Sequence, residues 1–334
     1  MISFCFYGCH KDVPAPLTAI TTNYGGTNGT IYAFTIYNGN LVIGGNFTMA
    51  GNISAQNIVL WDGSNWSAIG ALRTEVIALT VYHGQLIAGL SDGNIMQWNG
   101  ASWTSIGKVF KSPASINAFA EYNGNLIVCG VFDSITGLKA SNIAQWNGST
   151  WSALGVGINI GSSSLAVYNQ NLIVSAGSNV EQWNGTSWTY LGKTDLNTGI
   201  QTVYTDTINN TLIAVGDFDS IAGVFASYAA QWNGTAWIAL DKTHDIYSAW
   251  SVDIFDGTIV VVSEIGGISS LNRNAWTEVG STYNGGKYMA PGFNYASIVY
   301  KGYLYVGGVF VSLKNSDLSV NNIARWNGAS WSTL

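Results

Sequence analysis

The sequence is poor in charge, and this already excludes two classes of protein. Only 9% of its 334 residues are Asp, Glu, Lys or Arg, against roughly 25% in ordinary globular chains. The 12 basic residues are outnumbered by 18 acidic ones, so the chain lacks the basic stripe that binds nucleic acid. Intrinsic disorder is excluded as well, because 47% of the residues are apolar and 13% are aromatic.

Proline, cysteine, histidine and long apolar runs are also scarce. The four prolines stand beside 40 glycines, which indicates strands joined by glycine turns. No apolar run reaches the roughly 18 residues of a membrane span. Three cysteines do not form a disulfide framework. The three histidines, His10, His83 and His244, cannot assemble a three-histidine metal site, and we expect neither a metal nor a cofactor.

Tryptophan, in contrast, is abundant and regularly placed. Thirteen of the 14 tryptophans belong to one recurring unit, whose first position returns every 37 to 55 residues. Such a period is typical of propellers and solenoids. The copies are Trp61-Asp-Gly-Ser-Asn-Trp66, Trp98-Asn-Gly-Ala-Ser-Trp103, Trp146-Asn-Gly-Ser-Thr-Trp151, Trp183-Asn-Gly-Thr-Ser-Trp188, Trp232-Asn-Gly-Thr-Ala-Trp237, the degenerate Leu271-Asn-Arg-Asn-Ala-Trp276, and Trp326-Asn-Gly-Ala-Ser-Trp331.

Each repeat predicts four short strands. In the first, residues 33–37, 41–44, 57–61 and 66–69 are apolar segments bounded by turn residues such as Asn38-Gly39. Seven such repeats predict an all-β fold, a seven-bladed β-propeller with four antiparallel strands per blade. We expect one propeller domain over residues 31–334 and an N-terminal tail over residues 1–30. Helix-pair solenoids are excluded, because no repeat holds ten residues with helical periodicity.

The repeat resembles kelch-type propeller repeats. The shared pattern is Tyr-Asn-Gly-x-Leu-x-x-Gly-Gly-x-Phe, followed by Asn-Ile-x-x-Trp-Asn-Gly-Ser-x-Trp-Ser-x-Leu-Gly. It is more similar still to the Trp-Asn/Asp-Gly repeats of bacterial surface propellers and of fungal bud-site cortical-marker glycoproteins. The resemblance implies the fold over residues 31–334, whereas propellers host many activities.

Blade length alternates. Blades one, three, five and seven carry an insertion after the second strand, and this predicts duplication of a two-blade unit. The chain ends on the fourth strand of blade seven, Trp331-Ser-Thr-Leu334. We therefore expect the ring to close by packing of blade seven on blade one, and not by a blade shared between the termini. Residues 16–20 could add a strand.

The N-terminal tail resembles the end of a bacterial lipoprotein signal. An apolar stretch precedes Cys9, and a polar segment with two prolines follows it. The stretch is too short and lacks a basic segment, so this interpretation requires a start upstream of Met1, with Cys9 as the lipidated residue. The alternative is a frayed cytosolic terminus with two incidental cysteines.

Propeller topology separates the loops onto two faces. We call the face with the second-to-third-strand and blade-to-blade connections the variable face, because all variation in loop length falls there. Variable loops on a rigid scaffold commonly carry function. Eight of the 12 basic residues are also in these loops: Arg73, Lys108, Lys111, Lys139, Lys193, Lys242, Lys287 and Lys314.

The one tryptophan outside the repeat unit, Trp250, is expected just before the innermost strand of blade six, near the mouth of the channel. Aromatic side chains with a few polar partners suit stacking on sugars or binding of a peptide. The alternative is that long loops fold over and bury these aromatics. The predicted ligand-binding residues are Trp250, His244, Tyr247, Tyr283, Lys287, Tyr288 and Tyr295.

Catalytic groups are scarce. On innermost strands the carboxylates are Glu121, Asp206 and Asp253. Glu121 and Asp253 fall on adjacent positions when the blades are aligned, so they point to opposite sides of their strands and suit paired-carboxylate chemistry poorly. Asp206 belongs to a turn. Asp133, Asp217 and Asp219 could bind calcium, but no full ligand loop is present, and loop capping is the alternative.

These observations predict a monomeric, non-enzymatic binding propeller at the cell surface or secreted. It would present its variable face to a glycan or protein and meet the membrane only through a lipid anchor. The alternatives are a purely structural protein–protein interaction module and a polysaccharide lyase or hydrolase with an unrecognised site.

Overall fold

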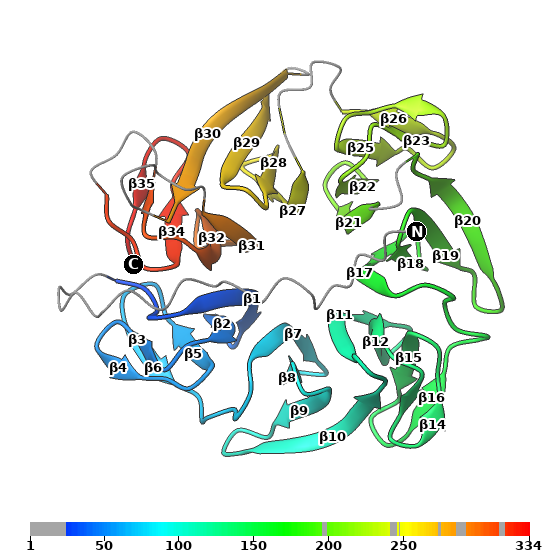
Figure 1. Ribbon diagram of the computed structural model, residues 1–334, viewed down its shortest axis with the longest axis horizontal. Helices are drawn as coiled ribbons and strands as arrows, with labels where there is room; N and C mark the ends of the chain where they lie inside the picture. Colours follow the sequence, from blue (N-terminus) through cyan, green and yellow to red (C-terminus); the bar gives the residue numbers. More distant parts are fainter. Residues whose placement is uncertain are drawn as a thin grey trace.

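A computed structural model describes residues 25–195, 199–240, 246, 248–272, 275–284, 292–313 and 318–334. Within these residues every regular element is a β-strand, and seven four-stranded antiparallel blades surround one axis (Figure 1). The predicted all-β, seven-bladed propeller is therefore confirmed. The same residues include no helix long and apolar enough to cross a membrane.

Each blade is built from consecutive strands, so none is shared between the two ends of the chain. The innermost strands are β1 (Thr30–Tyr37), β7 (Val76–Tyr82), β11 (Ser115–Tyr122), β17 (Ser162–Tyr168), β21 (Ile200–Asp206), β27 (Ala249–Phe255) and β31 (Phe293–Tyr300). The second strands are β2 (Asn40–Asn46), β8 (Gln85–Leu90), β12 (Asn125–Val131), β18 (Asn171–Ala176), β22 (Thr211–Gly216), β28 (Thr258–Ser263) and β32 (Tyr303–Val309).

The two outer strands of each blade flank the tryptophan unit. The third strands are β5 (Ile58–Trp61), β9 (Asn94–Trp98), β15 (Ile143–Trp146), β19 (Asn179–Trp183), β25 (Ala229–Trp232), β29 (Gly267–Asn272) and β34 (Ile323–Trp326). The fourth strands are β6 (Trp66–Ala68), β10 (Trp103–Phe110), β16 (Trp151–Ala153), β20 (Trp188–Lys193), β26 (Trp237–Ala239), β30 (Ala275–Tyr283) and β35 (Trp331–Ser332).

The hydrophobic core lies between adjacent blades. Second strands are buried on both faces, which explains their unbroken apolar runs such as Leu41–Ile43, where every side chain is fully buried. The predicted tryptophan pairs face each other across the hairpin, as in Trp146 opposite Trp151, whose ring centroids are 5.3 Å apart. The Asn147 side chain closes this turn by accepting hydrogen bonds from the next residues' N–H groups.

The insertions are small hairpins that pair with the neighbouring blade. They are β3 (Met49–Ala50) with β4 (Ile53–Ser54), β13 (Ser134–Ile135) with β14 (Leu138–Lys139), β23 (Ser220–Ile221) with β24 (Val224–Phe225), and β33 (Ser312–Leu313). In blades three, five and seven the hairpin pairs with the fourth strand of the preceding blade, through Val109–Ile135, Thr194–Ile221 and Thr282–Leu313.

The second tryptophan of the unit adds a hydrogen bond at the same joints. The indoles of Trp151, Trp237 and Trp331 donate to carbonyl oxygens of the preceding blade's fourth strand, over 2.6, 2.9 and 2.7 Å. At the alternate joints Trp103 makes this bond, whereas the buried indole N–H groups of Trp188 and Trp276 have no partner. Both kinds of contact therefore occur together where an odd-numbered blade follows an even-numbered one, which gives three such pairs of blades and leaves blade one outside them.

Residues 25–28 complete the joint between blades seven and one. Gly26 bridges to Asn321 of blade seven, and Thr27 bridges to Ala50 of blade one. A Cβ on Gly25 would lie 1.6 Å from the Leu334 carbonyl oxygen, so only glycine fits there. Closure thus uses this short strap in addition to the predicted blade packing. The proposed strand at residues 16–20 lies outside the described residues.

Candidate functional site

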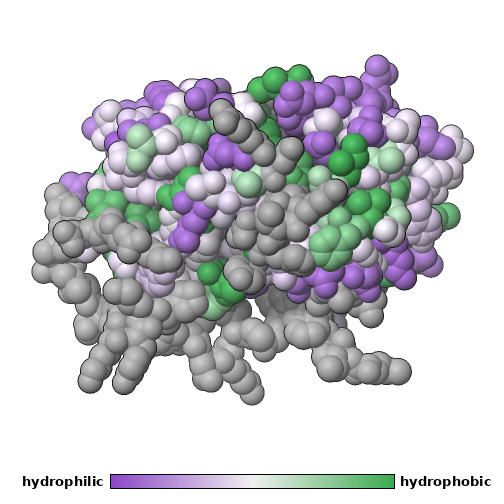
Figure 2. Space-filling model, turned by 90° about the horizontal axis from the view of Figure 1, so that it is seen from above, coloured by the Kyte–Doolittle hydropathy of each residue, from purple (hydrophilic) through white to green (hydrophobic). Residues whose placement is uncertain are grey.

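The insertion hairpins and the blade-to-blade connections lie on one face, as predicted. Their pairing shows this. Strand β13, which belongs to the insertion of blade three, is hydrogen-bonded to the end of β10, where the chain leaves blade two for blade three. The opposite face carries tight turns such as Asn123-Gly124, where both residues have positive φ. Seen from the rim, the visible apolar residues form separate patches within a hydrophilic surface (Figure 2).

Trp250 lies within the innermost strand of blade six, not before it. It is the second residue of β27 and is half-buried. The register of β27 against β28 shifts between Ala249 and Ser251, so Trp250 is the extra residue of a β-bulge. Bulges redirect a side chain and disturb the strand locally. Strand β27 continues beyond the bulge to Ala249, so it begins earlier than the sequence pattern predicted.

Every innermost strand has a bulge at the equivalent position. The seven innermost strands surround the axis (Figure 1). Each bulge is near the start of its strand, where the chain arrives from the variable face, so the bulge residues belong to the mouth of the axis on that face. In blade order they are Tyr32, Ile77, Asn117, Ser163, Gln201, Trp250 and Tyr295. All seven are half-buried.

Three consecutive bulge residues, from blades six, seven and one, form a continuous aromatic arc. The ring centroids of Trp250 and Tyr295 are 6.5 Å apart and nearly perpendicular, and those of Tyr295 and Tyr32 are 5.4 Å apart. The structure therefore unites two predicted site residues and adds Tyr32. Aligning the innermost strands of blades one, six and seven would have revealed Tyr32, because it occupies the same position as Trp250.

Blade five contributes the neighbouring polar group. The Thr202 hydroxyl donates to the Trp250 carbonyl oxygen at 2.6 Å and fixes β21 against β27. This places Gln201, the bulge residue beside Thr202, next to the aromatic arc around the mouth. On the other side of the ring, Asn117 donates to the Ser162 carbonyl oxygen at 2.8 Å, so that bulge residue supports the joint between blades three and four.

Two carboxylates belong to the variable face beside the arc. Glu264 follows β28 in blade six, and Asp217 follows β22 in blade five. Burial raises the pKa of Glu264, and the charge of Asp217 raises it further. Burial also raises the pKa of Tyr295, with a second contribution from Glu264. The carboxylate of Glu264 is thus electrostatically coupled to a ring of the arc.

Asp253 is buried inside the ring. Its carboxylate accepts a hydrogen bond from the Ser297 hydroxyl, which lies 2.8 Å from the hydroxyl of Ser251. Burial raises the pKa of Asp253 to about 7, while the Ser297 bond opposes this shift. The carboxyl is thus enclosed between blades six and seven, where its partner is the Ser297 hydroxyl of the next innermost strand.

The other innermost carboxylates have partners of their own. Asp206 closes a turn by accepting hydrogen bonds from the N–H groups of Ile208 and Asn209, as predicted. Glu121 is exposed on its strand in blade three and lies 3.6 Å from His83 at the tight-turn face. Burial raises the pKa of Tyr204, and the charges of Asp253 and Asp206 raise it further.

The remaining predicted binding residues divide into two groups. Tyr283 ends β30 at the outer edge of blade six, where it pairs with Ser312. The described residues show no ring contact between Tyr283 and the arc. The predictions that lie outside the described residues are His244, Tyr247, Lys287, Tyr288 and Cys9.

The proposed calcium ligands and the basic residues are dispersed. Asp133 faces Lys111 at 3.4 Å. Across the described ranges, no three or more His, Cys, Asp or Glu side chains are grouped to hold a metal ion. Of the eight basic residues expected on the variable face, Lys242, Lys287 and Lys314 lie outside the described residues.

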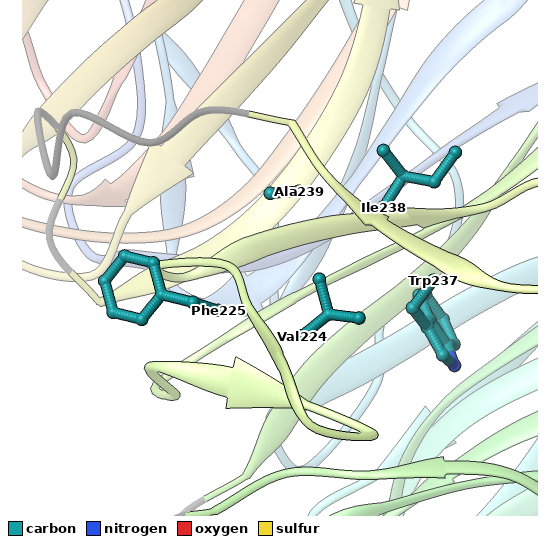
Figure 3. A pocket seen from close by; sticks show the side chains of 5 residues that line it. All are labelled: Val224, Phe225, Trp237, Ile238 and Ala239. Carbon is teal, nitrogen blue, oxygen red and sulfur yellow. The ribbon is translucent and has the colours of Figure 1, made fainter.

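A pocket at the rim of blade five was not anticipated. It lies between the hairpin β23–β24 and strand β26, and Figure 3 shows its lining. Phe225 and Ile238 are 49% and 42% exposed. In the corresponding places blade three has Lys139 and Ser152, so the fold does not require these apolar side chains. The lining residues are Val224, Phe225, Trp237, Ile238 and Ala239.

No protein-family model matches the chain, and a search of curated proteins finds no significant match. Solved propellers are similar in fold. The computationally designed Ika8 protein has a TM-score of 0.57 and 15% identity, with 93% of this chain and 88% of that chain covered. YCF48 bound to D1 peptide has a TM-score of 0.59 and 14% identity, with coverage of 90% and 93%.

A third similar structure is the extracellular domain of a hybrid two-component system from B. thetaiotaomicron. Its TM-score is 0.64 and its identity 12%, with 91% of this chain covered. This chain spans 39% of that longer one. At such identities the likeness establishes the propeller fold alone.

Proposed function

We propose that this propeller is a non-enzymatic binding protein whose variable face holds a glycan or protein ligand. The observation that carries the proposal is the contact of Trp250 and Tyr295 at the mouth of the ring. Half-buried aromatics on rigid innermost strands offer a large contact area at low entropic cost. The repeat itself does not require them, because blades three and four have Asn117 and Ser163 at the same position.

The proposal includes the absence of catalysis. General acid–base chemistry needs groups within hydrogen-bond reach of one reacting atom. Asp253 is enclosed, Asp206 closes a turn, and Glu121 lies at the tight-turn face. Turnover of any polysaccharide by the purified chain would contradict this part of the proposal.

Similar propellers agree with a binding role of this general kind. YCF48 was solved with a peptide, and the propeller from B. thetaiotaomicron is an extracellular domain. We extend both features to this chain as part of the proposal. A position at the cell surface through a lipid on Cys9 is the corresponding proposal for the tail. Mass spectrometry of protein expressed from an extended start tests it, and an unmodified Cys9 would refute it.

The binding proposal is tested on arrays of glycans and peptides. Wild-type protein should bind members of at least one array, and Trp250→Ala should abolish that binding. Ser163→Ala is the matched control, because Ser163 is the bulge residue of blade four, outside the arc. Binding by wild type and Trp250→Ala alike would place the ligand elsewhere, and binding to neither array would refute the proposal.

A further inference from the structure

Comparison of the seven bulge residues shows which side chains the fold accepts at this position. Each occupies the same backbone position in an innermost strand, so any requirement of the fold at that position must be met by all seven side chains. Ser163, Asn117 and Ile77 show that the position accepts a hydroxyl, an amide or an aliphatic group. Aromatic side chains in three consecutive blades are therefore not a requirement of the propeller.

The aromatic arc has a neutral amide residue at one end and a carboxylate residue beside it. At the blade-five end the next bulge residue is Gln201, a neutral amide, and its neighbour Thr202 donates to the Trp250 carbonyl oxygen. Glu264 lies beside the arc, because its backbone carbonyl oxygen accepts a hydrogen bond at 3.0 Å from the N–H of Asn294, the residue before Tyr295. The seven bulge residues themselves carry no charge. The mouth thus combines three mutually inclined aromatic rings with an amide and a carboxylate.

This combination selects a particular kind of ligand. A flat aromatic surface contacts the C–H face of a sugar ring, while the amide and the carboxylate bond its hydroxyl groups. A carboxylate beside the arc repels a ligand that carries its own negative charge. A protein ligand would instead be anchored by one or two side chains inserted into pockets, and a shallow arc shared by three strands offers less to such an anchor.

We infer that the mouth of the ring binds a neutral saccharide, with a sugar ring stacked on Trp250, further contacts from the inclined rings of Tyr295 and Tyr32, and its hydroxyl groups bonded by Gln201 and Glu264. This inference rests on the proposed function, because it names the ligand class of the same face. It also assigns a role to Tyr32 and Gln201.

The test is calorimetric titration of the full chain with two panels. One holds neutral gluco-, manno-, galacto- and xylo-oligosaccharides, and the other holds oligouronides. Wild type should bind a member of the neutral panel. Tyr32→Ala and Trp250→Ala should weaken that binding at least tenfold, whereas Tyr32→Phe, which retains the ring, should stay within about threefold of wild type. Ser163→Ala should bind as wild type does.

The outcomes separate this inference from the proposed function. Binding of oligouronides in preference to neutral sugars overturns the inference and leaves a glycan-binding propeller. Binding of peptides with no affinity for either panel overturns the inference and leaves a protein-binding propeller. Neutral-sugar binding that Tyr32→Ala does not alter places the saccharide outside the arc. Absence of binding to both panels and to peptides refutes both claims. Far-ultraviolet circular dichroism of each variant confirms that it is folded.

Discussion

The indole N–H of Trp151 donates to the carbonyl oxygen of Ile106 across the joint between blades two and three. Trp237 and Trp331 repeat this bond at the joints between blades four and five and between blades six and seven. Together with the paired insertion strands, these bonds add non-covalent contacts to the chain connection at every even–odd joint. The ring is therefore assembled from three such pairs and one additional blade.

Trp151→Phe should be more destabilising than Trp188→Phe by about 1–2 kcal/mol. Both substitutions remove an indole, but only the first breaks a hydrogen bond and leaves a carbonyl oxygen unpaired. Trp188 is the matched control because its buried N–H already lacks a partner. Urea denaturation of the two variants measures the difference. Equal losses would show that the bond contributes nothing to the joint.

Asn142→Ala should cost about 3 kcal/mol. The buried Asn142 side chain accepts a hydrogen bond from Phe132 N–H at 3.0 Å and donates to the Ile158 carbonyl oxygen at 2.7 Å, so two partners are orphaned. Its φ of 61° also penalises alanine. Asn142→Gly relieves the backbone but not the lost bonds, and should be about 1 kcal/mol less destabilising. A lower free energy of unfolding for Asn142→Gly than for Asn142→Ala, measured by denaturant titration, would contradict this prediction.

Asp253 should make stability depend on pH. Its pKa is about 7 in the folded chain, above the 3.8 of a freely exposed aspartate, so between these values the folded state holds a proton that the unfolded state has lost. The contribution is fully present below pH 3.8 and is lost as pH rises through 7. Asp253→Asn should remove this slope and be more stable than wild type at pH 8 by up to about 4 kcal/mol. If the free energies of unfolding of wild type and Asp253→Asn change with pH in parallel, the predicted contribution of Asp253 is wrong.

Cys129 should be chemically silent in the folded protein. Its thiol is fully buried, and burial raises its pKa to about 12. Native wild type and Cys129→Ala should therefore titrate the same number of thiols with a disulfide reagent. In guanidinium chloride wild type should titrate one more. An additional reactive thiol in native wild type would show that β12 opens on the timescale of the assay.

Much of the fold could be predicted from the sequence because the repeat is local. Turn pairs such as Asn38-Gly39 and tryptophan pairs such as Trp61–Trp66 lie within a few residues of each other, and seven copies reinforce one pattern. Pairing between blades has no such signature. The bridge from Thr27 to Ala50, and that from Val109 to Ile135, join short segments whose sequences do not specify a partner.

The candidate site could be predicted only in part. Trp250 was visible as the tryptophan outside the repeat unit, and Tyr295 as an aromatic near the next innermost strand. Their meeting with Tyr32 depends on ring closure, which brings residues from opposite ends of the chain together. Trp250 lies inside the strand and not before it, because pairing of β27 resumes at Ala249 beyond the bulge, and a bulge has no mark in composition.

The central claim is that repeated residues hold the ring together, whereas residues that depart from the repeat at its mouth serve binding. The free energy of unfolding of Trp250→Ala, measured beside that of Trp237→Ala, tests it most directly. Trp237 is 4% exposed and bonds Leu191, so its loss should cost about 3–5 kcal/mol. Trp250→Ala should cost less than about 1.5 kcal/mol, because its half-buried ring leaves no enclosed cavity. A loss from Trp250→Ala equal to that from Trp237→Ala would make Trp250 a core residue and contradict the account.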